Sequence, residues 1–170
     1  MKPEWLNHIK DKKIIAIDPG KEGGIAIFSV DKDRVVELQH MPETMQDLCT
    51  LIHNWSHNSI AYLERVGGIP GMGASAMFNF GKGVGHIEMA LLANKVPCIE
   101  VTPQKWQKEL QLGTKGKMSS NQWKTKLKDR AQQRYPNVEK EFKLNTKRAW
   151  LSVADALLIL EYARLNEIKQ

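Results

Sequence analysis

The chain has 170 residues, 42% of them hydrophobic and 26% charged, which is the composition of one folded domain and excludes a disordered chain. No apolar run approaches the roughly 20 residues that cross a bilayer, and residues 1–13 lack the apolar centre of a signal peptide, so we expect a cytoplasmic protein with no membrane partner. The net charge is +6, but residues 105–148 hold 13 Lys or Arg against four acids, whereas the rest of the chain holds 12 against 15.

Five segments have the length and apolar composition of β-strands: 13–18, 23–30, 34–40, 60–64 and 97–102. Helices are predicted to begin at 41–44 and to cover 86–94, the segment from Pro103 through Trp106, 121–135 and 149–165. Three segments are predicted to connect them: a flexible glycine-rich loop at 67–85, a mobile loop at 112–120 and a polar connection at 137–147. This order predicts a single α/β domain with a mixed five-stranded sheet and helices on both faces, in which 1–12 and 166–170 are peripheral.

Cysteines and tryptophans are expected to be structural. Cys49 and Cys98 lie in apolar patterns, and two cysteines this far apart are too few for a metal site, so we predict buried free thiols. Trp55, Trp106 and Trp150 have apolar neighbours at helical spacing and are predicted to lie in the core.

Three acids stand where apolar neighbours make a carboxylate costly. Asp18 ends the run KIIAID, Glu64 ends IAYLE, and Asp155 lies in AWLSVADALLIL, one turn into the last predicted helix. An unpaired carboxylate in a core costs several kcal/mol or becomes protonated. If the strands 13–18 and 60–64 are parallel neighbours, Asp18 and Glu64 emerge at the same edge of the sheet, where α/β sheets bind ligands, and Asp155 can complete the cluster.

A divalent cation would remove the cost of placing these acids together. Hard oxygen ligands, with water making up the rest, suit Mg²⁺, with Mn²⁺ as a substitute, better than zinc. Two such ions about 4 Å apart can activate a water and stabilise the leaving 3′-oxygen in phosphodiester hydrolysis. Gly20, Gly23 and Gly24 would let a backbone approach closely at this edge.

Each acid also has a purely structural interpretation. Asp18 could be a turn residue, Glu64 could pair with Arg65, and Asp155 could pair with Lys147 or Arg148. The coincidence of three acids, all flanked by apolar residues, favours the metal site over three separate structural roles.

The ordered motifs resemble those of the RuvC-like Holliday junction resolvases, in their phage and bacterial branch. The likeness runs from about residue 13 to residue 162 and rests on IDPG at 17–20, GGIA at 23–26, LE at 63–64, NFGKG at 79–83, TPQKW at 102–106 and ADALLI at 154–159. The resemblance implies an RNase H-like fold, a homodimer with one active site per subunit, and a bacterial or phage-infected cell. It also implies paired, Mg²⁺-dependent nicking of four-way DNA junctions, with up to two ions per subunit.

Carried onto this chain, the resemblance makes Asp18, Glu64 and Asp155 both catalytic residues and metal ligands. The family often has a fourth ligand three residues before the last acid, and here that position holds Ser152, which can act only through a metal-bound water. Some relatives carry a lysine directly after the TPxxW motif. Here that residue is Gln107, so no catalytic lysine is assigned.

The basic stretch suggests a polyanion partner, although a solvated helix face would have the same composition. The candidate contacts with DNA phosphates are lysines of this stretch and of the glycine-rich segment: Lys82, Lys105, Lys108, Lys115, Lys117 and Lys124. Phe78 and Phe80 could insert between bases at the crossover, or could begin the core face of the following helix. The helix at 86–94 has enough apolar residues for both a core face and a partner face, and symmetric cutting favours a C₂ dimer.

Two other functions remain open and a third is excluded. Another RNase H-like nuclease would use the same acids, and a junction-binding protein that has lost cleavage is an alternative to which Ser152 gives weight. A sugar-kinase-like ATPase also opens with a strand, an Asp and glycines, but it needs a second domain that 170 residues leave no room for.

Overall fold

The computed structural model describes residues 11–68 and 71–168. Its centre is one sheet of five strands in the order β3-β2-β1-β4-β5. The strands are β1 (Lys13–Asp18), β2 (Gly24–Ser29), β3 (Arg34–His40), β4 (Ser59–Glu64) and β5 (Cys98–Val101). β2 is antiparallel to β1 and β3, whereas β4 is parallel to β1 and β5. The predicted mixed sheet is therefore confirmed, with each strand within about a residue or two of its expected place.

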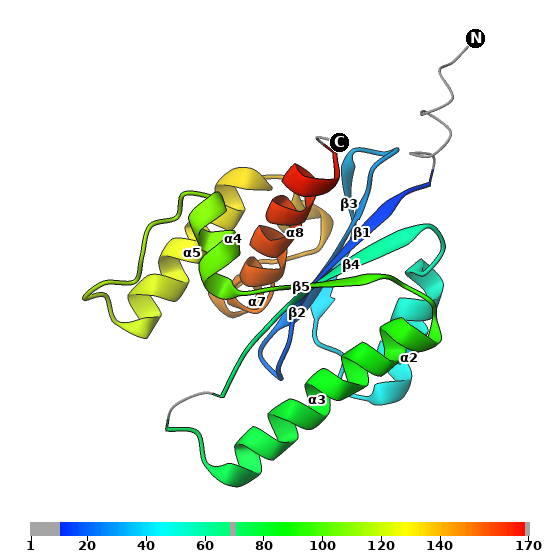
Figure 1. The fold of residues 1–170 in the computed structure, drawn as a ribbon. Helices are drawn as coiled ribbons and strands as arrows, with labels where there is room; N and C mark the ends of the chain where they lie inside the picture. The colour runs from blue at the N-terminus through cyan, green and yellow to red at the C-terminus, as the bar shows by residue number, and fades with distance from the viewer. Residues whose placement is uncertain (1–10, 69–70, 169–170) are drawn as a thin grey trace.

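Helices cover both faces of the sheet, as predicted (Figure 1). One face carries α4 (Pro103–Glu109), α5 (Ser120–Arg134), α7 (Lys147–Leu151) and α8 (Ala154–Glu167), and the other carries α2 (Met45–Trp55) and α3 (Ala74–Ala93). Side chains alternate along each strand, so Ile14 and Ala16 enter the core under α8 while Ile15 and Ile17 enter the core under α2 and α3. A short helix, α6 (Val138–Glu141), lies within the predicted polar connection.

Local signals in the sequence fix several helix starts. Thr44 caps α2 by accepting a hydrogen bond from the backbone N–H of Asp47. Ser119 and Gln122 form a reciprocal capping box at the start of α5. Thr102 caps α4, whose first residue is the predicted Pro103.

Helix α3 corrects the prediction of a flexible loop over 67–85. It begins at Ala74, so Gly81, Gly83 and Gly85 are helical. The residues of α3 that are buried, Ile87, Ala90 and Leu91, all lie in its C-terminal half. Once that half is packed on the sheet, extending the helix by another turn adds one hydrogen bond per residue, which offsets the poor helix propensity of glycine.

The last predicted helix is in fact two helices. α7 ends at Leu151, Ser152 is its C-cap, and Val153 is the N-cap of α8. Asp155 is therefore the second residue of a new helix rather than one turn into a continuous one. Ser152, the C-cap of α7, and Asp155 therefore do not belong to one continuous helix.

Both cysteines are exposed, which corrects the prediction of buried thiols. Cys49 lies on the outer side of α2, whose inner side is Leu48, Leu51 and Ile52. Cys98 lies on β5, the edge strand. Of the tryptophans, Trp106 and Trp150 are buried as predicted, and Trp55 is partly buried against the core.

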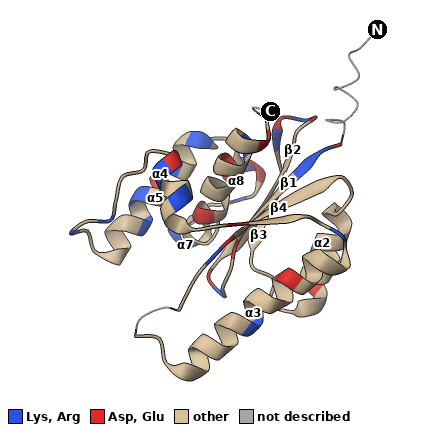
Figure 2. Cartoon of the chain, viewed as in Figure 1, with Lys and Arg blue, Asp and Glu red and all other residues tan. Residues whose placement is uncertain are grey.

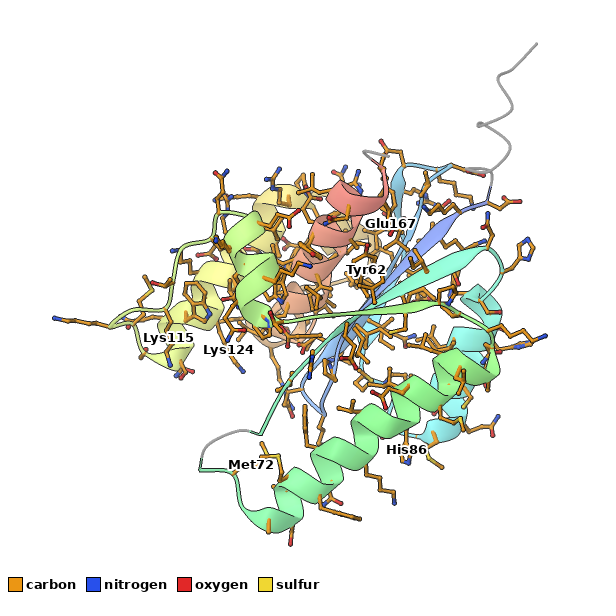
Figure 3. The ribbon with its side chains drawn as sticks, viewed as in Figure 1. Tyr62, Met72, His86, Lys115, Lys124 and Glu167 are labelled. Atoms are coloured by element: carbon orange, nitrogen blue, oxygen red, sulfur yellow. The ribbon has the colours of Figure 1, made fainter. Side chains whose placement is uncertain are left out.

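The C-terminal end of α8 returns to the sheet. Tyr62 donates a hydrogen bond of 2.8 Å to one carboxylate oxygen of Glu167, and Lys12 donates one of 2.7 Å to the other. Figure 3 shows Tyr62 and Glu167 together at this end of the helix. The two segments 1–12 and 166–170 are predicted to be peripheral. Most of the first segment (1–10) and the last two residues of the second (169 and 170) lie outside the described residues. No helix among residues 11–68 and 71–168 is long and apolar enough to cross a membrane.

Candidate functional site

Asp18 and Glu64 end adjacent parallel strands and face the same side of the sheet. Ile17 is paired in register with Leu63, so the next residues, Asp18 and Glu64, lie together at the carboxyl edge. Both follow the alternation that turns Ala16 and Tyr62 toward the core beneath α8. Asp155, in the first turn of α8, is on that same side, because α8 packs against β1, β2 and β4. The structure therefore brings the three predicted acids together.

Electrostatic coupling reflects this proximity. Burial raises the pKa of Asp18 well above its ordinary value, the charges of Asp155 and Glu64 raise it further, and Lys124 opposes the rise. Burial raises the pKa of Glu64 to about 7, with Asp155 adding to the rise and a hydrogen bond from Trp106 opposing it. Burial likewise raises the pKa of Asp155 to about 6 against the opposing charge of Lys124. The cluster thus holds excess negative potential that Lys124 only partly offsets.

Trp106 orients Glu64. The indole Nε1–H donates a hydrogen bond of 2.9 Å to Oε1 of Glu64, and both side chains are buried. The alternative pairing with Arg65 is not found, because Nε of Arg65 lies 3.6 Å from a carboxylate oxygen of Glu100 instead. Sequence reasoning placed Trp106 only in the core and missed this contact. The TPxxW motif gives the signal for it, since the cap and the proline fix the helix that carries the indole.

Gly24 sets the position of the junction between α7 and α8. A Cβ on Gly24 would lie 2.6 Å from the carbonyl oxygen of Ser152 and 3.3 Å from Val153, so the junction rests directly on this glycine. Similarly, a Cβ on Gly23 would lie 2.1 Å from the carbonyl oxygen of Asp18. These close approaches were predicted from the glycines. They explain how Asp155, two residues after Val153, reaches the edge where Asp18 emerges.

Ser152 is held by two hydrogen bonds. Its hydroxyl donates to the carbonyl of Ala149 at 2.7 Å and lies 3.2 Å from Nε2 of His40. His40 is paired in register with Gly24, which is paired in turn with Asp18, so all three occupy one row across the strands. His40 was not among the predicted site residues. Its place at the end of a strand beside the glycine pair is the signal that could have found it.

The donor set fits a hard divalent cation in its chemistry, since it consists of three carboxylates beside a sheet edge. As the side chains stand, no three His, Cys, Asp or Glu residues in the described part of the chain are arranged to hold one ion jointly. Mg²⁺ is usually bound by one or two carboxylates, waters and phosphate oxygens rather than by a closed protein cage. Among the described residues, neither Lys147 nor Arg148 pairs with Asp155, so its charge is left for another cation.

The predicted lysines are not gathered at one place. Lys124, on α5, is the one whose charge acts on both Asp18 and Asp155. The others are exposed and lie on three other segments: Lys105 and Lys108 on α4, Lys115 and Lys117 in the loop before α5, and Lys82 on α3 across the sheet. Figure 3 shows Lys115 and Lys124 on the α5 side of the molecule and Met72 on the α3 side.

The two candidate wedge residues have different surroundings. Phe78 is 71% exposed on the N-terminal half of α3. Phe80 is partly buried, and its ring would lie 3.2 Å from a Cβ added to Gly20, whose φ is +110°. Phe80 therefore packs over the turn that follows Asp18, whereas Phe78 points into solvent.

No family model matches the chain, and no curated protein matches it. Two solved structures of RuvC are similar to it in fold. One is titled "T. thermophilus RuvC in complex with Holliday junction substrate", with 16% identity and a TM-score of 0.53, and the other "Thermus thermophilus RuvC structure", with 17% identity and a TM-score of 0.55. Each comparison covers 91% of this chain and 96% of the RuvC chain. The chain therefore has the RNase H-like fold of these structures over nearly its whole length.

Proposed function

We propose that this protein is a structure-selective endonuclease that resolves four-way DNA junctions by paired, metal-dependent phosphodiester hydrolysis. The observation that carries the proposal is the meeting of Asp18, Glu64 and Asp155 at one sheet edge. Burial raises the pKa of all three, and neighbouring acids raise those of Asp18 and Glu64 further. Clustered, buried acids with no structural ion-pair partner are typical of a metal-binding catalytic site. The similarity in fold to a RuvC that was solved with a Holliday junction supports the choice of substrate.

Asp18, Glu64 and Asp155 would hold Mg²⁺, for which Mn²⁺ would substitute. The bound metal supplies Lewis-acid stabilisation of the phosphate and a water of lowered pKa, and two ions per subunit would serve both the attacking and the leaving oxygen. Trp106 orients the Glu64 carboxylate through its hydrogen bond of 2.9 Å. Lys124 adds a positive charge beside Asp18 and Asp155, where a phosphate would enter.

Paired cutting of a junction needs two active sites, so we propose a homodimer. Helix α3 supports this part of the proposal because it exposes Met89 at 60% and Leu92 at 71%, in the segment predicted to have a partner face. Large apolar side chains exposed along one helix are typical of an interface. Scattering mass of the protein on saturating junction is expected to show two chains per junction, and one chain would contradict the dimer.

The deciding experiment is cleavage of a labelled synthetic four-way junction in Mg²⁺. We expect symmetric nicks near the crossover for the wild type, none without metal and none for Asp18→Asn. Asp31→Asn is the matched control, because Asp31 is exposed in the turn between β2 and β3, and it is expected to cut like the wild type. Binding without strand scission in the wild type would mean a junction-binding protein. Equal scission of plain duplex or of an RNA–DNA hybrid would mean a different RNase H-like nuclease.

A further inference from the structure

The outward side of α5 and the start of α7 form an open groove of about 540 Å³. All eight residues that line it are charged or polar. Three of them are cations, Lys126, Arg130 and Lys147, and one is an acid, Asp129. Sites for small molecules enclose most of their ligand. An open groove lined by charged and polar residues, three of them cations, instead suits an extended polyanion.

The three cations of the groove are not neutralised by the protein. Among residues 11–68 and 71–168, none of them forms an ion pair with a carboxylate. Arg130 has only a long contact of 3.4 Å with the amide oxygen of Gln133, and Lys126 lies 5.3 Å above the ring of Trp123. The single acid, Asp129, is itself paired with Lys128 at 2.7 Å.

The three cations of the groove differ in this respect from two arginines nearby. Arg134, at the end of the same helix, lies 3.7 Å from Glu161, and Arg164 on α8 lies 3.2 Å from the same carboxylate. Figure 2 shows basic segments on the α4 and α5 side of the molecule, while α2 and α3 carry few charges. Within the described part of the chain, the groove therefore gathers three cations that have no carboxylate partner on one concave surface.

The neutral residues of the groove match the same partner. Asn121, Thr125 and Gln133 are side chains that commonly donate hydrogen bonds to phosphate oxygens, along with Lys and Arg. A smaller depression shares Thr125 and Lys147 with the groove, so the concave surface continues over the start of α7. From 121 to 133 the helix rises about 18 Å, a length over which one strand of duplex DNA carries about five phosphates.

The groove is separate from the carboxylate site. Lys124, whose charge reaches Asp18 and Asp155, lies on α5 about half a helical turn away from Lys126 and Gln122. One helix thus presents one side to the acids and the other to the groove. We infer that the groove between α5 and α7 binds the phosphate backbone of a duplex arm of the branched DNA, away from the crossover. This inference rests on the proposed function, because it takes branched DNA as the substrate.

The test is a triple variant, Lys126→Gln, Arg130→Gln and Lys147→Gln. Its binding to a labelled four-way junction is measured by fluorescence anisotropy over a range of salt concentrations, without added metal so that the DNA stays intact. The control triple, Lys32→Gln, Lys95→Gln and Lys140→Gln, removes the same charge from exposed residues outside the groove. Thermal melting confirms that both variants are folded.

We expect the groove variant to bind junctions with arms of about 20 base pairs more weakly, with a slope of log affinity against log salt reduced by about 2.7, since each lost phosphate contact removes about 0.9. Junctions whose arms are too short to reach the groove, and the control variant on either junction, are expected to behave like the wild type. Equal losses in both variants, or a groove variant with the wild-type slope, would overturn the inference. So would tighter binding of duplex RNA that depends on the same three cations. If the wild type itself fails to prefer or to cut four-way junctions, the proposed function fails instead, and the two failures are distinguishable.

Discussion

Replacing Glu64 with Gln should stabilise the metal-free protein while abolishing its activity. Gln keeps the oxygen that accepts the hydrogen bond of 2.9 Å from Trp106, but it removes the charge. The pKa of Glu64 rises from an ordinary 4.5 to about 7 in the folded chain, because burial opposes ionisation. The folded state therefore binds the proton more tightly than the unfolded state, and stability falls as pH rises between these two values.

The size of the effect follows from that rise. Above pH 7 the whole cost of ionising the buried carboxylate is present, about 3 kcal/mol, and Gln avoids it. For a chain of this length the melting temperature should increase by roughly 6–12 °C at pH 8. At pH 4.5 and below, Glu64 is protonated when folded, and wild type and variant should melt almost together.

The assay is thermal melting in chelator at pH 8 and at pH 4.5, with Glu100→Gln as the control. Glu100 is an exposed glutamate on the neighbouring strand β5, and its loss should change stability by less than about 0.5 kcal/mol. Adding Mg²⁺ at a hundred times its Kd should stabilise the wild type by about 2.7 kcal/mol and the variant by much less. A Glu64→Gln protein that melts no higher than wild type at pH 8, or higher by the same amount at both pH values, would refute the burial of an uncompensated charge.

Three further substitutions test other parts of the site. Ser152→Ala removes the hydrogen bonds to Ala149 and His40, so unfolding in urea should show a loss of stability of about 1 kcal/mol. The Mg²⁺ concentration for half-maximal cleavage should stay unchanged. A several-fold rise in that concentration would show that Ser152 helps to hold the metal. Gly24→Ala puts a Cβ 2.6 Å from the Ser152 carbonyl oxygen, so it should lower the free energy of unfolding by about 1–3 kcal/mol. It should also slow single-turnover cleavage by displacing the helix that carries Asp155. Wild-type stability and a wild-type cleavage rate would contradict the role of this glycine. Phe78→Ala should leave the melting temperature unchanged, because the ring is 71% exposed, and should reduce cleavage of junctions; undiminished cleavage would exclude the wedge.

The sheet and its edge could be predicted because their signals are local. The runs ending in Asp18 and Glu64 each carry their own period and composition, and parallel pairing of β1 with β4 then places both acids at one edge. The break between α7 and α8 could not be predicted in this way. Residues 149–165 are continuously compatible with a helix, and the break lies against Gly24, which is far away in the sequence and leaves room for the Ser152–Val153 backbone.

The contacts that orient the acids were missed for the same reason. Trp106 and Glu64 are 42 residues apart, and His40 and Ser152 are 112 residues apart. A tryptophan among apolar neighbours looks like a core residue, and nothing in its own segment shows that its N–H needs a partner or which acid will supply one. The types of the ligating residues are therefore visible in single segments, whereas their orientation depends on contacts that only the folded chain creates.

The glycines of α3 bear on how the protein meets its partner. Gly81, Gly83 and Gly85 are helical without positive φ, and a Cβ added to any of them would meet nothing within 4 Å. Neither backbone conformation nor packing within the chain requires glycine there, yet each costs about 1 kcal/mol relative to alanine in a helix. Missing side chains allow close approach of another backbone. The same helix exposes Phe78, so its composition is the one expected of a helix that is completed by DNA or by a second subunit, as the proposed junction resolvase requires.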